Sequence, residues 1–401
     1  MQVIRQITND ITYVGASDRR LSLFENIFPI PRGVSYNSYV INDEKTALLD
    51  TADYNVSRAF TENVKAALNG KKLDYIVVNH MEPDHIGSLK LIADLYPEAV
   101  IVATKKAVDM MAQFFGDELK NEKKVVKEGD TVSLGKHELS FYMAPMVHWP
   151  EVMVTYDSFE KVLFSADAFG TFGALNGNIF NDEYDIDREW LPDYRRYYTN
   201  ICGKYGMQVQ SLLKKALTLD VQVICPLHGP IWRSNLVYII NKYDLWSKYE
   251  AEGNSVMIAY ASVYGNTENA AYCLANELSK LGVKDIAMYD VSLTDVSYLI
   301  SETFRCSHIV LMSTTYNLEI YPKMDDYISD MKRLNVSNKT FAIVDNGTWA
   351  PTAGKKMREA VETLKNCKIC ENTTTIKSAV NDGNAAALSA LAQEIAAEIQ
   401  G

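Results

Sequence analysis

The sequence predicts an α/β protein of two domains, an αββα sandwich followed by a doubly wound parallel sheet. Three observations lead to this. The chain has 401 residues, more than one domain usually holds. Its first part is rich in short apolar strands, and helical segments join them from residue 87 onward. Its last part alternates strictly between apolar strands and helices, as in a parallel sheet covered on both faces.

The first domain is predicted to contain two sheets with helices outside them. Between the strands, "NDEK" supplies a hairpin turn within residues 35–53. The predicted strands occupy residues 11–18, 35–53, 75–80, 99–104, 137–145, 152–157, 161–169 and 221–229.

A domain boundary is predicted within residues 248–262, "KYEAEGNSVMIAYAS". There a charged helix end meets Gly253 and Asn254, and a new apolar strand begins. We therefore expect domains at 1–251 and 252–401, the second being of the right size for one doubly wound sheet. Its predicted strands are residues 255–262, 285–291, 307–317, 340–347 and 374–380, with a helix at 267–282 after the first.

The composition of the chain is that of a globular protein that does not bind nucleic acid as its main ligand. With 47% hydrophobic and 23% charged residues the chain reads as globular, and its net charge of −11 argues against nucleic acid as a ligand. Its apolar runs are too short to span a membrane, and the first 15 residues lack a secretory signal, so we expect a cytoplasmic protein. The six cysteines are scattered apart from "CKIC", which we interpret as part of a strand, and no disulfide framework is implied.

The stretch "VVNHMEPDHIGS", residues 77–88, gathers possible metal ligands. His80, Glu82, Asp84 and His85 lie within six positions. Neither a strand nor a regular helix turns all four toward one point, whereas a tight loop after a strand can wrap them around one or two ions.

Three more candidates are expected where apolar strands end, namely His148, Asp167 and His228. A single histidine in such a place is more often a hydrogen-bonded structural residue, but four of only six histidines share it. Seven ligands are too many for one tetrahedral ion and suit two ions with a bridge, for which Asp167 is the natural residue. His137 and His308 lie in ordinary strand or turn contexts and are left out.

The loop resembles that of the metallo-β-lactamase superfamily, whose signature is H-x-H-x-D-H. Here Glu82 stands at the second position, which gives H-x-E-x-D-H, the variant of the flavodiiron proteins. Carboxylate oxygen is a harder donor than imidazole and shifts such a site from zinc toward iron or manganese.

The second domain carries a phosphate-loop pattern, "YASVYGNTENAA", between a strand and a helix. Hydroxyls, backbone N–H groups and the helix N-terminus there would cradle a phosphate, and the segment resembles the FMN loop of flavodoxins. Alone it is about as compatible with an ordinary helix cap, but two later loops follow apolar strands, and aromatic residues at strand ends can stack on a flavin. Trp349 could instead be a core or interface residue, and Leu318 stands where many flavodoxin-like proteins carry glycine. The candidate FMN contacts are Ser262, Val263, Tyr264, Gly265, Asn266, Thr267, Ser313, Thr314, Thr315, Tyr316, Asn317, Asn346, Gly347, Thr348, Trp349 and Ala350.

The resemblance covers nearly the whole chain and implies a flavodiiron protein with FMN and two iron ions. It implies reduction of dioxygen to water, of nitric oxide to nitrous oxide, or of both. By the same resemblance His80, Glu82 and His148 would hold one iron, Asp84, His85 and His228 the other, and Asp167 would bridge them.

The resemblance also implies partners. A rubredoxin domain would add two C-x-x-C pairs, so electrons are expected from a separate carrier such as rubredoxin. A head-to-tail homodimer, or a homotetramer built from two such dimers, is expected. Tyr194, Tyr197 and Tyr198 are expected to lie beside the ligands, and no role is assigned to them. Two alternatives stay open: a zinc hydrolase fused to a flavodoxin domain, and a non-enzymatic redox or metal-sensing module.

Overall fold

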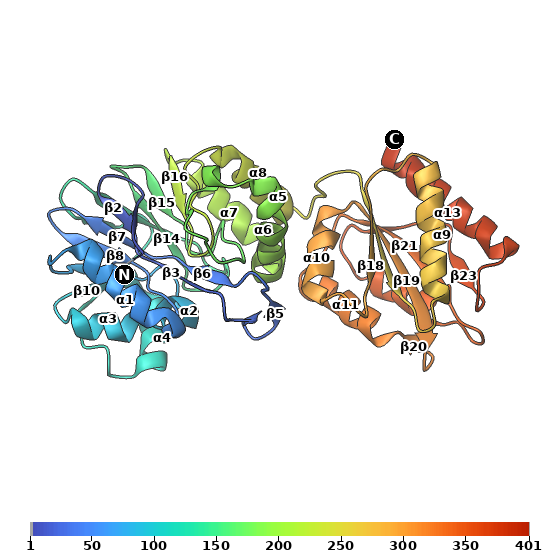
Figure 1. Cartoon of the computed structure of the whole chain (residues 1–401), viewed down its shortest axis with the longest axis horizontal. Coiled ribbons are helices and arrows are strands. Elements are labelled where there is room, and N and C mark those ends of the chain that lie inside the picture. The colour runs from blue at the N-terminus through green and yellow to red at the C-terminus, as the bar shows by residue number, and fades with distance from the viewer. Residues whose placement is uncertain (1–2, 401) are drawn as a thin grey trace. The chain divides into compact units, whose positions relative to one another are not determined.

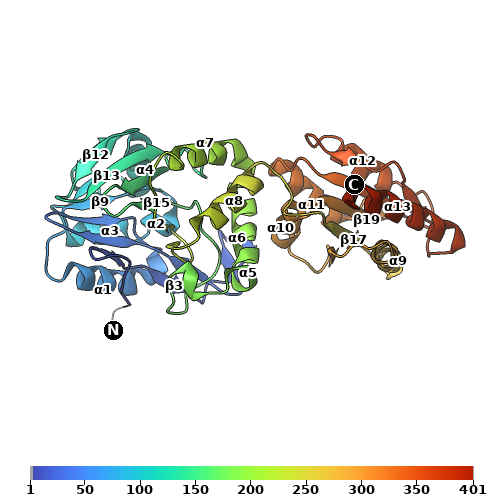
Figure 2. The same cartoon turned by 90° about the horizontal axis from the view of Figure 1, so that it is seen from above.

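The computed structural model describes residues 3–400 and divides into two compact units (Figures 1 and 2). The first comprises Met1–Tyr198 and Met207–Asp244, and the second comprises Thr199–Gly206 and Leu245–Gly401. The second unit thus includes the short segment Thr199–Gly206, which interrupts the first unit in sequence. The domain boundary predicted between residues 251 and 252 stays a prediction. Among residues 3–400, the helices are all too short or too polar to cross a membrane.

The first unit is an αββα sandwich, as predicted. One sheet has the strand order β1-β2-β7-β8-β9-β10-β11 and the other β12-β13-β14-β15-β16. The inner faces meet where the ring of Tyr39 on β7 lies 5.4 Å from that of Phe164 on β15. The first sheet consists of β1 (Arg5–Gln6), β2 (Ile11–Tyr13), β7 (Tyr39–Asn42), β8 (Thr46–Leu49), β9 (Tyr75–Val77), β10 (Val100–Thr104) and β11 (Lys123–Val126). The second consists of β12 (Thr131–Ser133), β13 (Glu138–Met143), β14 (Met153–Asp157), β15 (Val162–Phe164) and β16 (Val223–Cys225).

Helix α1 packs on the first sheet through an apolar stripe. In α1, residues Phe60, Val64 and Leu68 recur four apart and are buried, and α1 contacts β7. Two small antiparallel sheets of two strands each, β3 (Ala16–Asp18) with β6 (Val34–Tyr36) and β4 (Leu23–Phe24) with β5 (Phe28–Pro29), also belong to the unit. Its helices are α1 (Ser57–Leu68), α2 (Pro83–Ile86), α3 (Leu89–Leu95), α4 (Lys105–Phe115), α5 (Ile186–Glu189), α6 (Leu191–Tyr197), α7 (Gly206–Ala216) and α8 (Leu236–Ser247), the last ending in the second unit.

The second unit is a doubly wound sheet with the order β18-β17-β19-β21-β22, and every pairing along it is parallel. Helices α9 and α13 pack together, as do α10 and α11, and Figure 1 shows the two pairs apart from each other. Its elements are β17 (Val256–Ala261), α9 (Asn266–Lys280), β18 (Ile286–Asp290), α10 (Val296–Arg305), β19 (His308–Tyr316), β20 (Glu319–Ile320), α11 (Pro322–Arg333), β21 (Thr340–Asn346), α12 (Ala353–Val361), β22 (Lys368–Ile369), β23 (Thr374–Ile376) and α13 (Asp382–Gln400). The "CKIC" segment lies at β22 with Cys370 buried, which agrees with its interpretation as part of a strand.

One local prediction is confirmed and one is wrong. The strand predicted at residues 307–317 is β19, which continues through Tyr316 because Ser313 pairs with Asp345 and Thr314 with Asn346 of β21. His148 was expected to end a strand, but β13 ends at Met143 and His148 lies in the connection to β14. Backbone pairing across the sheet decides where each of these strands ends.

Candidate metal centre

The seven predicted metal ligands come together in the first unit as two adjacent groups. His80, Glu82, His148 and Asp167 place one ligand atom each within 4.8 Å of one another, and Asp84, His85 and His228 do the same. Three of the segments that carry them leave parallel-paired strands, namely β9, β15 and β16, so their carboxyl ends deliver the side chains.

The loop after β9 is held by a buried carboxylate. Asp50 accepts hydrogen bonds from the backbone N–H and the amide of Asn79, both at 2.7 Å. Glu82 is extended and precedes α2, where Pro83 occupies a position that needs no hydrogen-bond donor. The single turn of α2 then carries Asp84 and His85, so the predicted tight loop is half loop and half helix.

Asp167 stands between the two groups. Its Oδ2 lies 3.2 Å from Nε2 of both His80 and His148. Its Oδ1 lies 3.1 Å from Nε2 of His85 and 3.5 Å from Nε2 of His228. Each oxygen therefore faces one group, as a bridging carboxylate requires.

The remaining ring nitrogens of two histidines are fixed by hydrogen bonds. Nδ1 of His80 bonds Oε1 of Glu151 at 2.8 Å, and Nδ1 of His228 donates to the carbonyl of Ser35 at 2.7 Å. Both arrangements leave Nε2 facing the cluster, which is the usual way in which a metal-binding imidazole is oriented. Neither Glu151 nor Ser35 was predicted, since nothing in the local sequence marks them.

The electrostatics of the cluster fit a cation. Burial lowers the pKa of His148, but hydrogen bonds to Asp167 and Glu82 outweigh it and raise the pKa to about 9. Burial raises the pKa of Asp167, yet the neighbouring imidazoles bring it well below its usual range. Within residues 3–400, Nε2 of His80 and of His228 and both oxygens of Asp84 are buried without a hydrogen-bond partner. Buried polar atoms rarely stay unsatisfied, so a bound metal ion is the fitting partner.

Aromatic rings cover the cluster. Phe24 lies 5.5 Å from the ring of His228, Tyr197 also 5.5 Å, and Trp149 lies 5.4 Å from the ring of His80. Of the predicted tyrosines, Tyr194 accepts a hydrogen bond from Nε1 of Trp232, and Tyr198 lies 4.9 Å from the ring of Tyr243.

Glu25, on the hairpin between β4 and β5, was not predicted. Desolvation, followed by the neighbouring charge of Glu82, raises the pKa of Glu25 to about 8. A carboxyl group brought from 57 positions away in the sequence leaves no local signal.

The second unit brings the predicted flavin residues to one edge of its sheet. Ala261 pairs with Ser313 and Thr314 with Asn346, so the segments after β17, β19 and β21 share that edge. The amide of Asn346 donates to Oγ1 of Thr267 at 3.2 Å, which ties two of them together. Tyr264 and Trp349 are 92% and 79% exposed, so they are free to contact a ligand.

The first of these segments suits a phosphate. Gly265 has φ +88°, which favours glycine, and a Cβ built on it would meet only the distant carboxylate of Glu268. Helix α9 then begins without a side-chain cap on its first N–H groups.

The side-chain hydroxyls of two predicted FMN contacts, Ser313 and Thr315, already form hydrogen bonds within the protein. The hydroxyl of Ser313 is buried and donates to the carbonyl of Thr314 at 3.0 Å. Oγ1 of Thr315 accepts from the N–H groups of Thr352 and Ala353, at the start of α12. Both residues belong to β19, and their hydroxyls serve the fold.

Known proteins match both units. Residues 34–229, which include all seven candidate ligands, match the family model "ODP family beta lactamase". The nitric oxide reductase of Moorella thermoacetica is 32% identical over 374 residues, which is 92% of each chain. The structure resembles the rubredoxin oxygen:oxidoreductase of Desulfovibrio gigas, with TM-score 0.92, 27% identity and coverage of 99% of this chain and 98% of that one. It also resembles the flavodiiron protein of Giardia intestinalis, with TM-score 0.91, 25% identity and coverage of 99% and 95%.

A β-lactamase-like domain joined to a flavodoxin-like sheet defines a class of flavoprotein oxidoreductases. The chain belongs to the flavodiiron protein family.

Proposed function

We propose that this protein reduces dioxygen to water, nitric oxide to nitrous oxide, or both, at a diiron site served by FMN. The observation that carries this proposal is the set of buried, unsatisfied ligand atoms around Asp167. When bound, two ferrous ions and a reduced flavin supply four electrons, enough for one dioxygen or for the coupling of two nitric oxides. The zinc hydrolase alternative is not favoured, because Glu82 is an oxygen donor and the named relatives are reductases.

We assign the ligands as the sequence suggested. His80, Glu82 and His148 would hold one iron, Asp84, His85 and His228 the other, with Asp167 between them. The chain's own contribution is to orient these groups and to exclude water. Glu151 and Ser35 fix two imidazoles, and the rings of Phe24, Tyr197 and Trp149 cover the cluster.

We assign the FMN phosphate to Ser262–Thr267 at the start of α9, and the ring to the exposed edge near Trp349. The uncapped helix start and the open space at Gly265 support this. An external donor such as rubredoxin, a cytoplasmic location and a head-to-tail homodimer or homotetramer complete the proposal. The name of the Desulfovibrio gigas relative, rubredoxin oxygen:oxidoreductase, supports rubredoxin as the donor.

The test is anaerobic purification from iron-sufficient medium, quantitation of metal and flavin, and parallel consumption assays with both gases and a reduced donor. We expect two irons and one FMN per chain and turnover of at least one gas. A native protein that holds two zincs, and that stays inactive with both gases after reconstitution with iron, would refute the proposal.

The dimer is tested by complementation. A variant lacking the metal site, Asp84→Ala, is mixed under subunit exchange with a variant unable to bind FMN. In a head-to-tail dimer one interface of the mixed species pairs an intact flavin with an intact diiron site, so activity should return. Continued inactivity after proven exchange would rule out electron transfer between chains.

A further inference from the structure

An apolar cleft opens on the first unit between α7 and α8, the two helices labelled in Figure 2. Its volume is about 180 Å³, and its lining residues are all aliphatic or phenylalanine. The mouth is marked by Leu217 and Val237, which are 71% and 65% exposed, whereas the floor residues Leu163, Phe169 and Ile224 are buried. The cleft therefore leads from solvent to the outer face of the second sheet.

The floor of this cleft continues into the segments that carry the candidate ligands. Leu163 precedes Asp167 by four residues, and Ile224 precedes His228 by four, which is at most about 13 Å of extended chain. Phe169 comes closer still, two residues after Asp167.

The wall between cleft and cluster is thin at Phe169 and Gly170. Phe169 lines the cleft and has φ +66°, a strained conformation for a bulky residue. At Gly170 a Cβ would lie 2.9 Å from the carbonyl of Asp167 and 3.5 Å from Cβ of His228. One residue thus faces the cleft while the next packs against the cluster.

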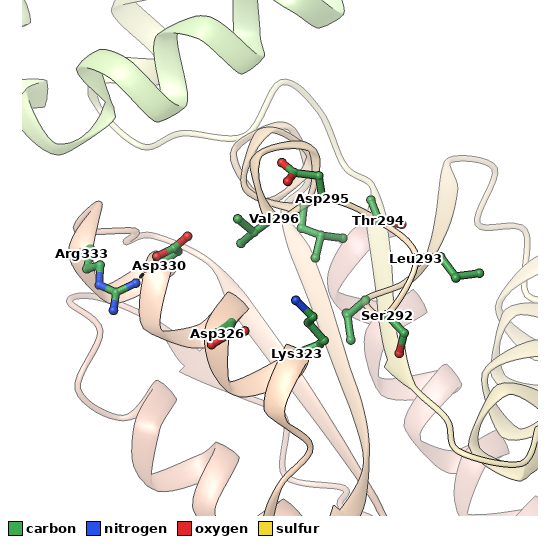
Figure 3. A pocket seen from close by; sticks show the side chains of 11 residues that line it. Ser292, Leu293, Thr294, Asp295, Val296, Lys323, Asp326, Asp330 and Arg333 are labelled. Atoms are coloured by element: carbon green, nitrogen blue, oxygen red, sulfur yellow. Dashed lines mark hydrogen bonds and ion pairs between the residues drawn. The ribbon is translucent and has the colours of Figure 1, made fainter. Parts of the chain in front are cut away.

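The chemistry of the cleft selects its occupant. An apolar hollow of this kind offers water no partners and takes up neutral apolar molecules such as xenon. The cavity of about 350 Å³ in the second unit is different (Figure 3): it is lined by charged residues such as Lys323 and Asp326, Arg333 there pairs with Asp330, and Asp295 caps α10. Of these two hollows, the cleft is the one that suits a diatomic gas.

We propose that the cleft between α7 and α8 binds the gaseous substrate and admits it to the metal cluster past Phe169. This inference rests on the proposed function, since it takes the substrate to be dioxygen or nitric oxide. The apolar lining concentrates the gas and keeps water away from the buried ligands.

The first test uses xenon, which reports occupancy without any reaction. Crystals of the holoprotein under xenon pressure should show the atom in the cleft. Ala216→Trp, which fills the lining, should abolish that site. Ala112→Trp, an exposed alanine on α4, is the matched control and should leave it unchanged. Absence of xenon from the wild-type cleft would overturn the proposal.

The second test measures how fast nitric oxide binds to the chemically reduced holoprotein in a stopped-flow instrument. Ala216→Trp should slow the second-order rate constant severalfold with metal and flavin content unchanged. Val237→Trp at the exposed mouth should do the same, and it remains informative if the first variant fails to fold. Unchanged rates in a folded variant would overturn the proposal, as would a change of oligomeric state, because the cleft would then be a protein interface. A wild-type protein that takes up xenon but reacts with neither gas would refute the proposed function rather than the cleft.

Discussion

Glu151 should tune one iron site without being a ligand. Its carboxylate is buried, bonds Nδ1 of His80 at 2.8 Å and accepts from the N–H of Met81 at 2.9 Å. A hydrogen bond to a charged group contributes about 1.5–3 kcal/mol, and loss of such an orienting partner typically weakens metal binding about 10- to 100-fold. We therefore expect Glu151→Leu to lose roughly that factor in affinity at the site of His80.

The assay is anaerobic competition of the iron-loaded protein with a chelator, with metal counted at each chelator concentration. Iron should leave Glu151→Leu at a lower chelator concentration than it leaves the wild type, and the loss should begin at the site of His80. Glu151→Gln keeps an acceptor oxygen, so its affinity for iron should lie between those of Glu151→Leu and the wild type.

The control is the pair formed by His137 and Asp157, which has the same chemistry. Nδ1 of His137 bonds Oδ2 of Asp157 at 2.9 Å, both side chains are buried, and neither belongs to the seven candidate ligands. Asp157→Asn should leave iron affinity unchanged. Equal loss of iron in Asp157→Asn and Glu151→Leu would show that the effect is one of general stability and would refute the orienting role.

Three further substitutions test other parts of the molecule. Asp167→Ala should empty at least one of the two sites, as counted by metal analysis after anaerobic purification, because it removes a carboxylate that faces both halves of the candidate cluster. Thr267→Ala should weaken FMN binding by roughly 1–2 kcal/mol in a fluorescence titration, since it removes one hydroxyl of the proposed phosphate site. Burial lowers the pKa of Lys339 to about 8 from 10.5, so the folded chain loses this proton at lower pH than the unfolded chain and its stability rises with pH between those values. Lys339→Met should lack that rise, which amounts to about 3 kcal/mol, when urea unfolding of both proteins is compared at pH 7 and pH 10.

The seven candidate ligands could be picked out from the sequence because each lies close to an apolar strand. A histidine or aspartate after a run such as that before Asp167 stands out against its neighbours, and parallel strands bring their carboxyl ends to one edge. Glu82 was informative for the same reason, since its spacing from His80 and Asp84 is local.

The residues that orient the ligands could not be predicted in this way. Glu151 reaches His80 across 71 positions, and Ser35 reaches His228 across 193. Such pairs depend on how the two sheets stack, which no local pattern encodes.

The two halves of the cluster should behave as one unit because of the position of Asp167. Oδ2 is 3.2 Å from the imidazoles of His80 and His148, while Oδ1 is 3.1 Å from that of His85. A rotation of this carboxylate that favours one half must move the oxygen that serves the other. Binding of the first ion would therefore hold Oδ1 in place for the second, which favours paired loading over two independent sites. The buried backbone around it leaves little freedom, since the N–H of Gly170 is bonded to the carbonyl of Asp167 at 3.0 Å. Partial loading should accordingly give a mixture of empty and doubly occupied chains.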